Sequence, residues 1–136
     1  MHVKVLITIK SLSMREPLKD KTRLEHILDA IDRLEKYASS LSREELEADV
    51  LRYYGIVKNI EIIGEAANML SAQFKDTHTE VEWHPISNMR NFLVHEYFQV
   101  DNDTVWAVIH SDIVDLKKQI LKYLAETDWK RWEKEQ

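Results

Sequence analysis

The chain has 136 residues, of which 44% are hydrophobic and 32% charged, and these values are typical of one soluble globular domain with its own core. The absence of Cys excludes disulfides and thiolate metal sites. A net charge of −5 argues against nucleic-acid binding by the surface at large, because phosphates need basic side chains, and leaves only a local positive cleft for RNA.

Gly and Pro occur only twice each. So few helix-breaking residues over this length favour long helices over a many-stranded sheet. No apolar run approaches the length of a membrane-spanning helix, and no secretory signal pattern is present. We therefore expect an all-α protein that does not enter a membrane and resides in the cytoplasm.

The N-terminal part of the chain combines an extension with a first helix. Residues 1–13 contain a β-branched run that is typical of a strand, but we interpret them as a disordered or loosely attached extension. The first helix is predicted from about Lys21 to Tyr37, with Asp20 as its N-cap. His26 lies off its apolar stripe and is expected to be solvated. That stripe comprises Leu24, Ile27, Leu28, Ile31 and Leu34.

A second helical segment begins with a capping box formed by Ser42 and Glu45. A long helix is then predicted from Asp49 to about Phe74. Gly55 and Gly64 lie inside this helix, where each costs about 1 kcal/mol relative to Ala. We expect close packing against a neighbouring backbone to compensate for that cost. The apolar set of this helix comprises Val50, Tyr54, Val57, Ile60, Ile63, Ala67 and Leu70.

The same helix carries two carboxylates, Glu61 and Glu65, at the four-residue spacing of a paired-carboxylate metal site. No His follows either of them at three or four residues within the helix, so a di-metal site is not supported. We interpret the two carboxylates as partners for a basic side chain such as Arg90, because a buried guanidinium needs a partner.

The second half of the chain alternates loops and helices. Polar residues from Lys75 to Glu82 predict a loop, in which His78 is expected to be exposed. Trp83 opens the next helix. A linker, residues 99–102, precedes a last long helix that is predicted to begin with Asp103 as its N-cap. The stripe of that helix comprises Val105, Ile109, Ile113, Leu116, Ile120 and Leu124.

Residues 127–136 form a C-terminal tail, in which Trp129 and Trp132 stand three residues apart among charged side chains. Two alternatives follow for this tail. It either forms a final turn that docks back on its own chain or covers a neighbouring chain. His110, beside the stripe of the last long helix, is expected to be packed rather than catalytic.

The segment from Ile86 to Phe98 carries a permanent cation, a titratable imidazole and a phenol within one apolar helical stretch. Arg90 and His95 are five residues apart and point about 140° apart on a regular helix, whereas Asn91 shares the face of His95. One straight helix therefore cannot aim Arg90 and His95 at one atom. Either the helix loosens near His95, or a second copy of the chain completes the site.

These residue types suit cleavage of RNA. His95 titrates near neutrality and suits a base that takes the proton of a ribose 2′-hydroxyl. Arg90 suits stabilisation of the charge that develops on phosphorus, because a guanidinium stays charged and matches phosphate oxygens. Asn91 is suited to orient His95 or to hold a phosphate. This chemistry requires no metal ion and no other cofactor.

Residues 89–97 read Met-Arg-Asn-Phe-Leu-Val-His-Glu-Tyr and resemble the Met-Arg-Asn-x-Leu-Val-His-x-Tyr core of HepT-like HEPN proteins, the toxin halves of HEPN/MNT toxin–antitoxin pairs. Two further blocks are similar to the same family. Residues 23–31 resemble its first helix and residues 60–71 its second, and the whole resemblance covers roughly residues 14–125.

This resemblance implies a HEPN-like up-and-down bundle of four to five helices, organised as a two-fold homodimer in which Arg90 and His95 of both chains line one cleft. It also implies a metal-independent endoribonuclease toxin with RNA as its substrate. The HEPN domain would comprise residues 14–126. In the family a basic residue often lies near the position of His84, so His84 is expected either to add positive charge to the cleft or to play a structural role.

For Tyr97 the resemblance implies a regulatory role, because the motif Tyr of HepT-like toxins receives AMP from the partner antitoxin, a small nucleotidyltransferase. Nucleotide bulk and negative charge beside Arg90 would occupy the phosphate site and repel RNA. Two alternatives stay open. One is a non-catalytic HEPN module that binds nucleotides or docks a partner. The other is a structural motif, in which Glu61 or Glu65 satisfies Arg90 while His95 fills a helix interface.

Overall fold

The computed structural model of the protein describes residues 19–91 and 102–136. Within these residues the chain forms helices and no β-strand, so the predicted all-α class is confirmed. The elements in order are α2 (Asp20–Tyr37), α3 (Arg43–Ala48), α4 (Val50–Met69), α5 (Ala72–Thr77), α6 (Trp83–Asn88), the 3₁₀ turn η1 (Met89–Asn91), α7 (Asn102–Ala107), the π-helical segment η2 (Val108–Asp112), α8 (Ile113–Glu126) and α9 (Trp129–Lys134).

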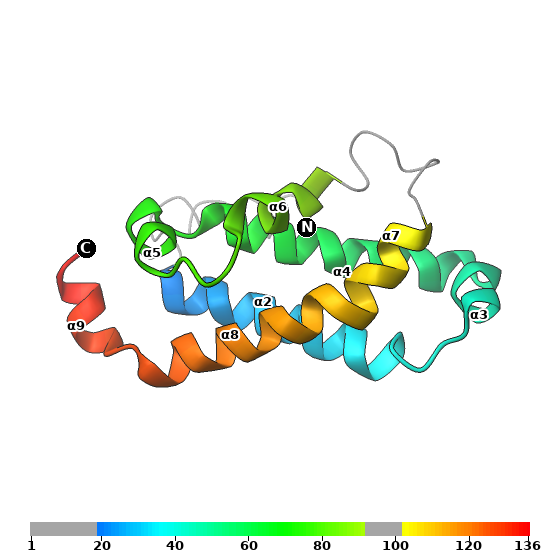
Figure 1. Ribbon diagram of the computed structural model, residues 1–136, viewed down its shortest axis with the longest axis horizontal. Coiled ribbons are helices and arrows are strands. Elements are labelled where there is room, and N and C mark those ends of the chain that lie inside the picture. The colour runs from blue at the N-terminus through cyan, green and yellow to red at the C-terminus, as the bar shows by residue number, and fades with distance from the viewer. Residues whose placement is uncertain (1–18, 92–101) are drawn as a thin grey trace, which may run out of the picture.

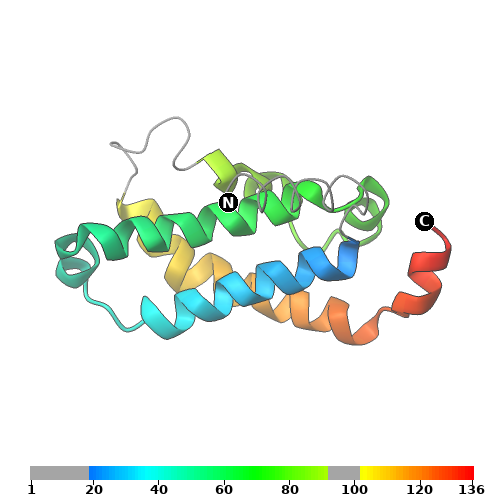
Figure 2. The same cartoon turned by 180° about the vertical axis from the view of Figure 1, so that it is seen from behind.

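The described helices run back and forth along the long axis of the molecule (Figure 1). The first pass is α2, and α4 returns beside it, as the view from behind also shows (Figure 2). The third pass is α6 with η1, and the fourth is the continuous run of α7, η2 and α8. The predicted up-and-down bundle is therefore confirmed for the single chain.

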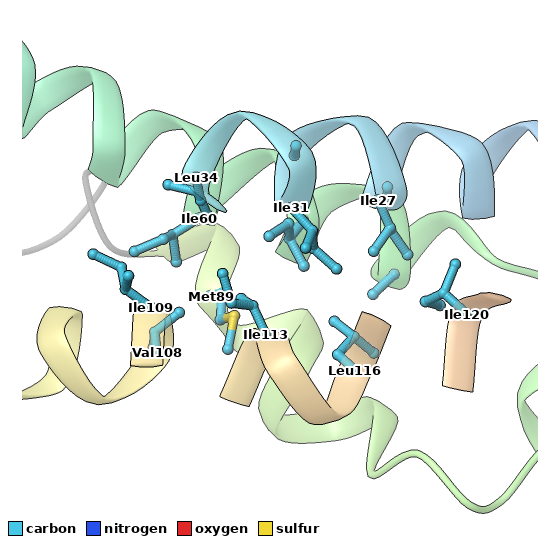
Figure 3. Close-up of a cluster of buried hydrophobic side chains, with 14 of the residues drawn as sticks. Ile27, Ile31, Leu34, Ile60, Met89, Val108, Ile109, Ile113, Leu116 and Ile120 are labelled. Carbon is cyan, nitrogen blue, oxygen red and sulfur yellow. The ribbon is translucent and has the colours of Figure 1, made fainter. Parts of the chain in front are cut away.

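The core forms where the apolar stripes of these helices meet. On α2 the predicted stripe is buried, with Leu28 packed at its edge, while His26 is exposed as expected. The predicted stripe of the last helix is also buried as far as Ile120. Figure 3 shows Met89 pointing from η1 into the same cluster as Ile113. The third pass, α6 with η1, therefore packs on the core at Met89, the residue directly before Arg90.

Asp20 is the first residue of α2, and the N-cap is Lys19, so the predicted capping role of Asp20 is wrong. Its buried carboxylate instead accepts three hydrogen bonds from distant residues. The donors are the Ser71 backbone N–H at 2.8 Å, the Ser71 hydroxyl at 2.7 Å and the Trp132 indole N–H at 3.0 Å. Asp20 thus joins the start of the first helix to two later parts of the chain.

The helix predicted to run to Phe74 ends earlier. It stops at Met69, and Ser71 caps a separate helix by accepting a hydrogen bond from the Phe74 backbone N–H at 3.1 Å. At its other end, Val50 and Tyr54 are 62% and 39% exposed, contrary to their predicted burial. They lie in the first turns of α4, at one end of the bundle, where fewer helices cover them (Figure 1). The remaining members of the predicted apolar set are buried.

The capping box at the start of α3 is confirmed. The Ser42 backbone N–H donates to the Glu45 carboxylate at 3.0 Å, and the Glu45 backbone N–H donates to the Ser42 hydroxyl at 3.1 Å. The backbone bond from Ser42 is the main reason why the pKa of Glu45 lies below its ordinary value. Asp103, in contrast, is not an N-cap, because α7 already begins at Asn102 and Asp103 pairs with Arg43.

The C-terminal residues dock back on their own chain, which is the first of the two alternatives for the tail. They form α9, whose Trp132 bonds to Asp20 and whose neighbour Glu133 pairs with Lys19 at 3.3 Å. His78 belongs to the same end of the molecule and is partly buried, because its ring stacks on Phe74 with 3.8 Å between centroids. The prediction of an exposed loop histidine is therefore wrong.

His110 was predicted to be packed, but it is exposed on η2, where it makes three contacts with neighbouring residues. Its ring stacks on Trp106 at 4.0 Å, and its two ring nitrogens lie 3.0 and 3.1 Å from the carbonyl oxygens of Trp106 and Ser39. Within the described residues no helix is both long and apolar enough to cross a membrane.

Candidate functional site

Arg90 lies where the third pass of the bundle changes geometry. The α-helix α6 ends at Asn88, and the chain tightens into the 3₁₀ turn η1, which contains Arg90 and Asn91. A 3₁₀ helix has about three residues per turn, so the regular α-helical geometry on which the angle of about 140° was based does not hold within η1. Met89 anchors the turn, because only 6% of it is exposed.

Gly64 of α4 brings this turn close to the neighbouring helix. A Cβ atom placed on Gly64 would lie 2.7 Å from the carbonyl carbon of Met89 and even closer to the backbone nitrogen of Arg90. Such distances are far below van der Waals contact, so only glycine permits this crossing. The predicted close packing is thus confirmed for Gly64. It is wrong for Gly55, which has nothing within 4 Å of the same virtual atom.

This crossing places Arg90 and Asn91 beside the outer face of α4. Together with Lys58, Glu61, Ile62 and Glu65 they line a pocket of about 400 Å³, which we call the arginine pocket. Arg90 and Asn91 are both partly buried. The sequence analysis expected Arg90 near Glu61 and Glu65, and the three residues do lie around one pocket.

The charges in the arginine pocket are paired differently from the expectation. The ammonium of Lys58, rather than Arg90, contacts the Glu61 carboxylate, at 3.0 Å. The other oxygen of Glu61 is buried without a hydrogen-bond partner, and none of the described residues forms an ion pair with Arg90. Satisfaction of Arg90 by Glu61 or Glu65, on which the structural alternative depends, is therefore not observed in this part of the chain.

The other predicted site residues are placed as follows. His84 is exposed on α6, where one ring nitrogen lies 3.4 Å from the Asn88 amide nitrogen, and it does not line the arginine pocket. His95 and Tyr97 lie outside the described residues. Their proposed roles, and the shared face of Asn91 and His95, stay predictions.

Sequence reasoning missed Lys58 as a second cation of the pocket. The signal was available, because Lys58, Glu61 and Glu65 recur at helical spacing and share a face of α4. Lys58 was not identified as a site residue because it lies between Gly55 and Gly64, in a part of the helix that resembles an ordinary solvent-exposed surface. Over residues 19–91 and 102–136 no group of three His, Asp or Glu side chains is arranged to hold a metal ion.

Comparison with known families matches residues 27–123 to the family model described as HepT-like (Ribonuclease HepT-like). This match covers more than half of the chain, including α4, α6 and η1. No solved structure matches the chain significantly.

Several curated proteins are similar to the chain. One, from Caldanaerobacter subterraneus subsp. tengcongensis, is named "Putative RNase TTE0752" and is 37% identical over 74% of this chain and 90% of its own length. The "Probable ribonuclease HepT" of Thermococcus cleftensis is 33% identical over 75% of this chain and 93% of its own length. A third, from Methanocaldococcus jannaschii, is named "Gamma-glutamylcyclotransferase and putative RNase MJ0434" and is 33% identical over 79% of this chain. The match spans only 49% of that longer relative.

Proposed function

The chain belongs to the HepT-like ribonuclease family, and from this premise we propose that it is an endoribonuclease toxin of a HEPN/MNT toxin–antitoxin pair that needs no metal ion. One observation carries the proposal. The guanidinium of Arg90 belongs to an open pocket of about 400 Å³ and forms no ion pair with the carboxylates beside it in the described chain. A partly buried, unpaired cation of this kind is suited to an anionic ligand such as a phosphate.

In the proposed reaction His95 takes the proton from a ribose 2′-hydroxyl, and the 2′-oxygen attacks the adjacent phosphorus. Arg90 stabilises the negative charge that develops on the phosphoryl oxygens. The bond from phosphorus to the 5′-oxygen breaks, and that oxygen receives a proton from an imidazolium or from water. The products are a 2′,3′-cyclic phosphate and a 5′-hydroxyl, so atoms and charges balance without a cofactor.

We expect two copies of the chain to meet across the outer face of α4 and to complete the cleft. Leu51, Lys58, Ile62 and Met69 recur at spacings of seven, four and seven residues, which is the pattern of a helix-pairing stripe. Leu51 is 84% exposed and Met69 48% exposed, and between them lies the arginine pocket. A second copy on this stripe would cover the exposed apolar side chains and bring a second Arg90 to the same cleft.

The antitoxin of the proposed pair is a small nucleotidyltransferase that attaches AMP to Tyr97. Support for this part comes from the family resemblance of residues 89–97 and from the positive charge of Arg90, seven residues before Tyr97. An added phosphate seven residues from Arg90 would compete with RNA for the same cation. The intact mass of the protein, purified with and without a co-expressed nucleotidyltransferase antitoxin, tests it, with a gain of one adenylate on Tyr97 as the expected result.

Cleavage of a mixed RNA by the purified protein in excess EDTA tests the main proposal. We expect cleavage, and we expect Arg90→Ala or His95→Ala to reduce its rate by about 10²-fold or more. Arg131→Ala and His26→Ala serve as matched controls, because both residues are exposed and distant from the arginine pocket. Intact RNA after prolonged incubation with the wild-type dimer, or equal rates for all four variants, would contradict the proposal.

Sedimentation velocity tests the dimer. A Leu51→Asp substitution places a charge on the proposed stripe and is expected to yield monomers that no longer cleave RNA. Leu121→Asp is the control, because Leu121 is similarly apolar and 46% exposed but lies on α8. Dissociation by both variants, or by neither, would show that the outer face of α4 is not the interface.

A second candidate function is a nucleotide-binding module without catalysis, which the carboxylates of the arginine pocket favour. Glu61 and Glu65 repel a polyanion, but a carboxylate oxygen such as the unpartnered one of Glu61 can accept hydrogen bonds from a base or a ribose hydroxyl. Calorimetric titration with mononucleotides distinguishes the two candidates. Tight nucleotide binding that Arg90→Ala abolishes, together with uncleaved RNA, would establish the module instead of the nuclease.

A further inference from the structure

A second concavity, larger than the arginine pocket, lies between α6 and the run of α7, η2 and α8. Its volume is about 640 Å³, and its floor includes the apolar side chains of Met89 and Leu116. Four carboxylates line it, from Glu80, Glu82, Asp112 and Asp115, and Lys118 is the single ammonium in its lining. We call this concavity the acidic groove.

The carboxylates of the acidic groove differ from many others on this protein in their lack of ion pairs among the described residues. Elsewhere Asp32 and Glu35 share Lys117 at 3.1 and 2.9 Å, and Glu133 contacts Lys19. Within the described residues none of the four groove carboxylates forms an ion pair. The groove therefore sets four negative charges against the single ammonium of Lys118 among its described lining residues.

Three further observations describe an unsatisfied acceptor and the negative charge of the groove. The Gln119 side-chain oxygen is buried and has no hydrogen-bond partner among the described residues. The pKa of Asp112 is raised, first by burial and then by the like charge of Asp115. Burial, followed by the charge of Glu80, raises the pKa of the neighbouring Tyr123 to about 12. A ligand for this groove would have to bring donors and positive charge.

The charge and the apolar floor of the groove exclude two further classes of ligand. RNA is repelled by four carboxylates, and a small metal ion would leave the apolar floor uncovered. A segment of protein in which Lys or Arg side chains flank aliphatic ones matches both parts of the groove at once. We propose that the acidic groove docks such a cationic amphipathic segment of a partner protein.

This proposal is independent of RNA cleavage, because it depends only on the groove. It has a consequence for the arginine pocket. Met89 forms part of the groove floor, and its carbonyl carbon lies against Gly64 directly before Arg90. A partner seated in the groove would therefore contact the short turn that positions Arg90.

The binding experiment uses a synthetic peptide of repeated Leu-Lys-Lys-Leu units and the full-length protein labelled at the Met methyl groups. Nuclear magnetic resonance should show that the peptide shifts the Met89 methyl signal and leaves that of Met69, on the outer face of α4, in place. A Leu-Glu-Glu-Leu counterpart should have no effect. A Met89 signal that stays unmoved at saturating basic peptide, or that moves equally with the acidic one, would overturn the proposal.

A matched pair of double variants gives a second, quantitative readout by fluorescence anisotropy of the labelled peptide. D112N/D115N should weaken binding about tenfold, because it removes two carboxylates that can pair with the ammonium groups of the peptide. E25Q/D29N removes the same charge from the exposed surface of α2 and should leave the affinity unchanged. Removal of two repelling carboxylates should not unfold the protein, and a thermal melt verifies this. Equal affinities for the two double variants, or displacement of the peptide by an RNA oligomer, would refute the proposal.

Discussion

The two halves of α4 carry the same residue in opposite environments. At the Gly64 end, the backbone of Met89 and Arg90 lies where a side chain would be. At the Gly55 end, nine residues earlier, the same virtual Cβ meets open space, and Val50, Leu51 and Tyr54 are exposed around it. The comparison shows that one end of the helix serves to position the candidate site, whereas the other end is held by caps and by contacts with α7 and leaves an apolar surface exposed.

The largest effect is expected for Gly64→Ala. The new methyl group would force the η1 backbone away from α4, and overpacking of this kind costs about 2–3 kcal/mol of unfolding free energy. The displaced Arg90 should lower the rate of RNA cleavage by about 10²-fold, because misplacement by about 1 Å has that effect. Urea denaturation and the cleavage assay measure the two effects. Unchanged values of both would show that the close crossing does not position Arg90.

Asp20→Asn should have the next largest effect, because Asp20 closes the Gly64 end of the molecule. The neutral amide keeps only one acceptor oxygen for the Ser71 and Trp132 donors, and we expect a loss of about 2 kcal/mol in unfolding free energy. Asp29→Asn, on the exposed face of the same helix, should change stability by no more than about 0.5 kcal/mol. Similar losses for the two variants would mean that the buried carboxylate contributes no special stability.

At the Gly55 end, Ser42→Ala tests the capping box and should cost about 1 kcal/mol near neutral pH. The pKa of Glu45 is lowered from 4.5 by its bonds to Ser42, so the box is fully formed above that value. Its contribution is lost as the pH falls through the lower pKa of the folded state. Denaturation curves at neutral and acidic pH should therefore show a smaller cost of the substitution in acid. A larger cost in acid would contradict this interpretation.

The smallest effect is expected for Gly55→Ala, which is the counterpart of the first substitution. Because the added methyl group meets nothing and Ala has the higher helix propensity, unfolding free energy should rise by about 0.5–1 kcal/mol. RNA cleavage should stay at the wild-type rate. A decrease in stability would reveal a contact of Gly55 in the assembled dimer, and the concentration dependence of the melting temperature would then identify it.

Periodicity was sufficient to predict those parts of the fold that depend on local pattern. The stripes of α2 and α8 and the Ser42–Glu45 box follow from spacing alone, because their partners lie within a few residues or along one helix face. Asp20 shows where this reasoning fails. An acidic residue before an apolar stripe resembles an N-cap, and only the folded chain brings it to Ser71 and Trp132, 51 and 112 residues away.

For the candidate site, the sequence correctly predicted that Arg90 lies beside two carboxylates of α4. It did not predict which of these charged side chains form ion pairs. Charge pairing depends on which side chain reaches which, and Lys58 reaches Glu61 from the same helix. Gly55 and Gly64 could not be distinguished from the sequence, because their neighbouring residues do not indicate which part of the chain packs against each glycine. The break of α4 before Ser71 was missed for a similar reason, because helix-forming residues flank the capping serine.

The bond between Asp20 and Trp132 also has a consequence for the order of events in the cell. Trp132 follows Asp20 by 112 residues, so this contact cannot form until nearly all described residues have been synthesised. The capping box of α3 needs only four consecutive residues and can form while the chain is still growing. We therefore expect the end of the bundle that positions Arg90 to mature later than the end that carries the capping box of α3.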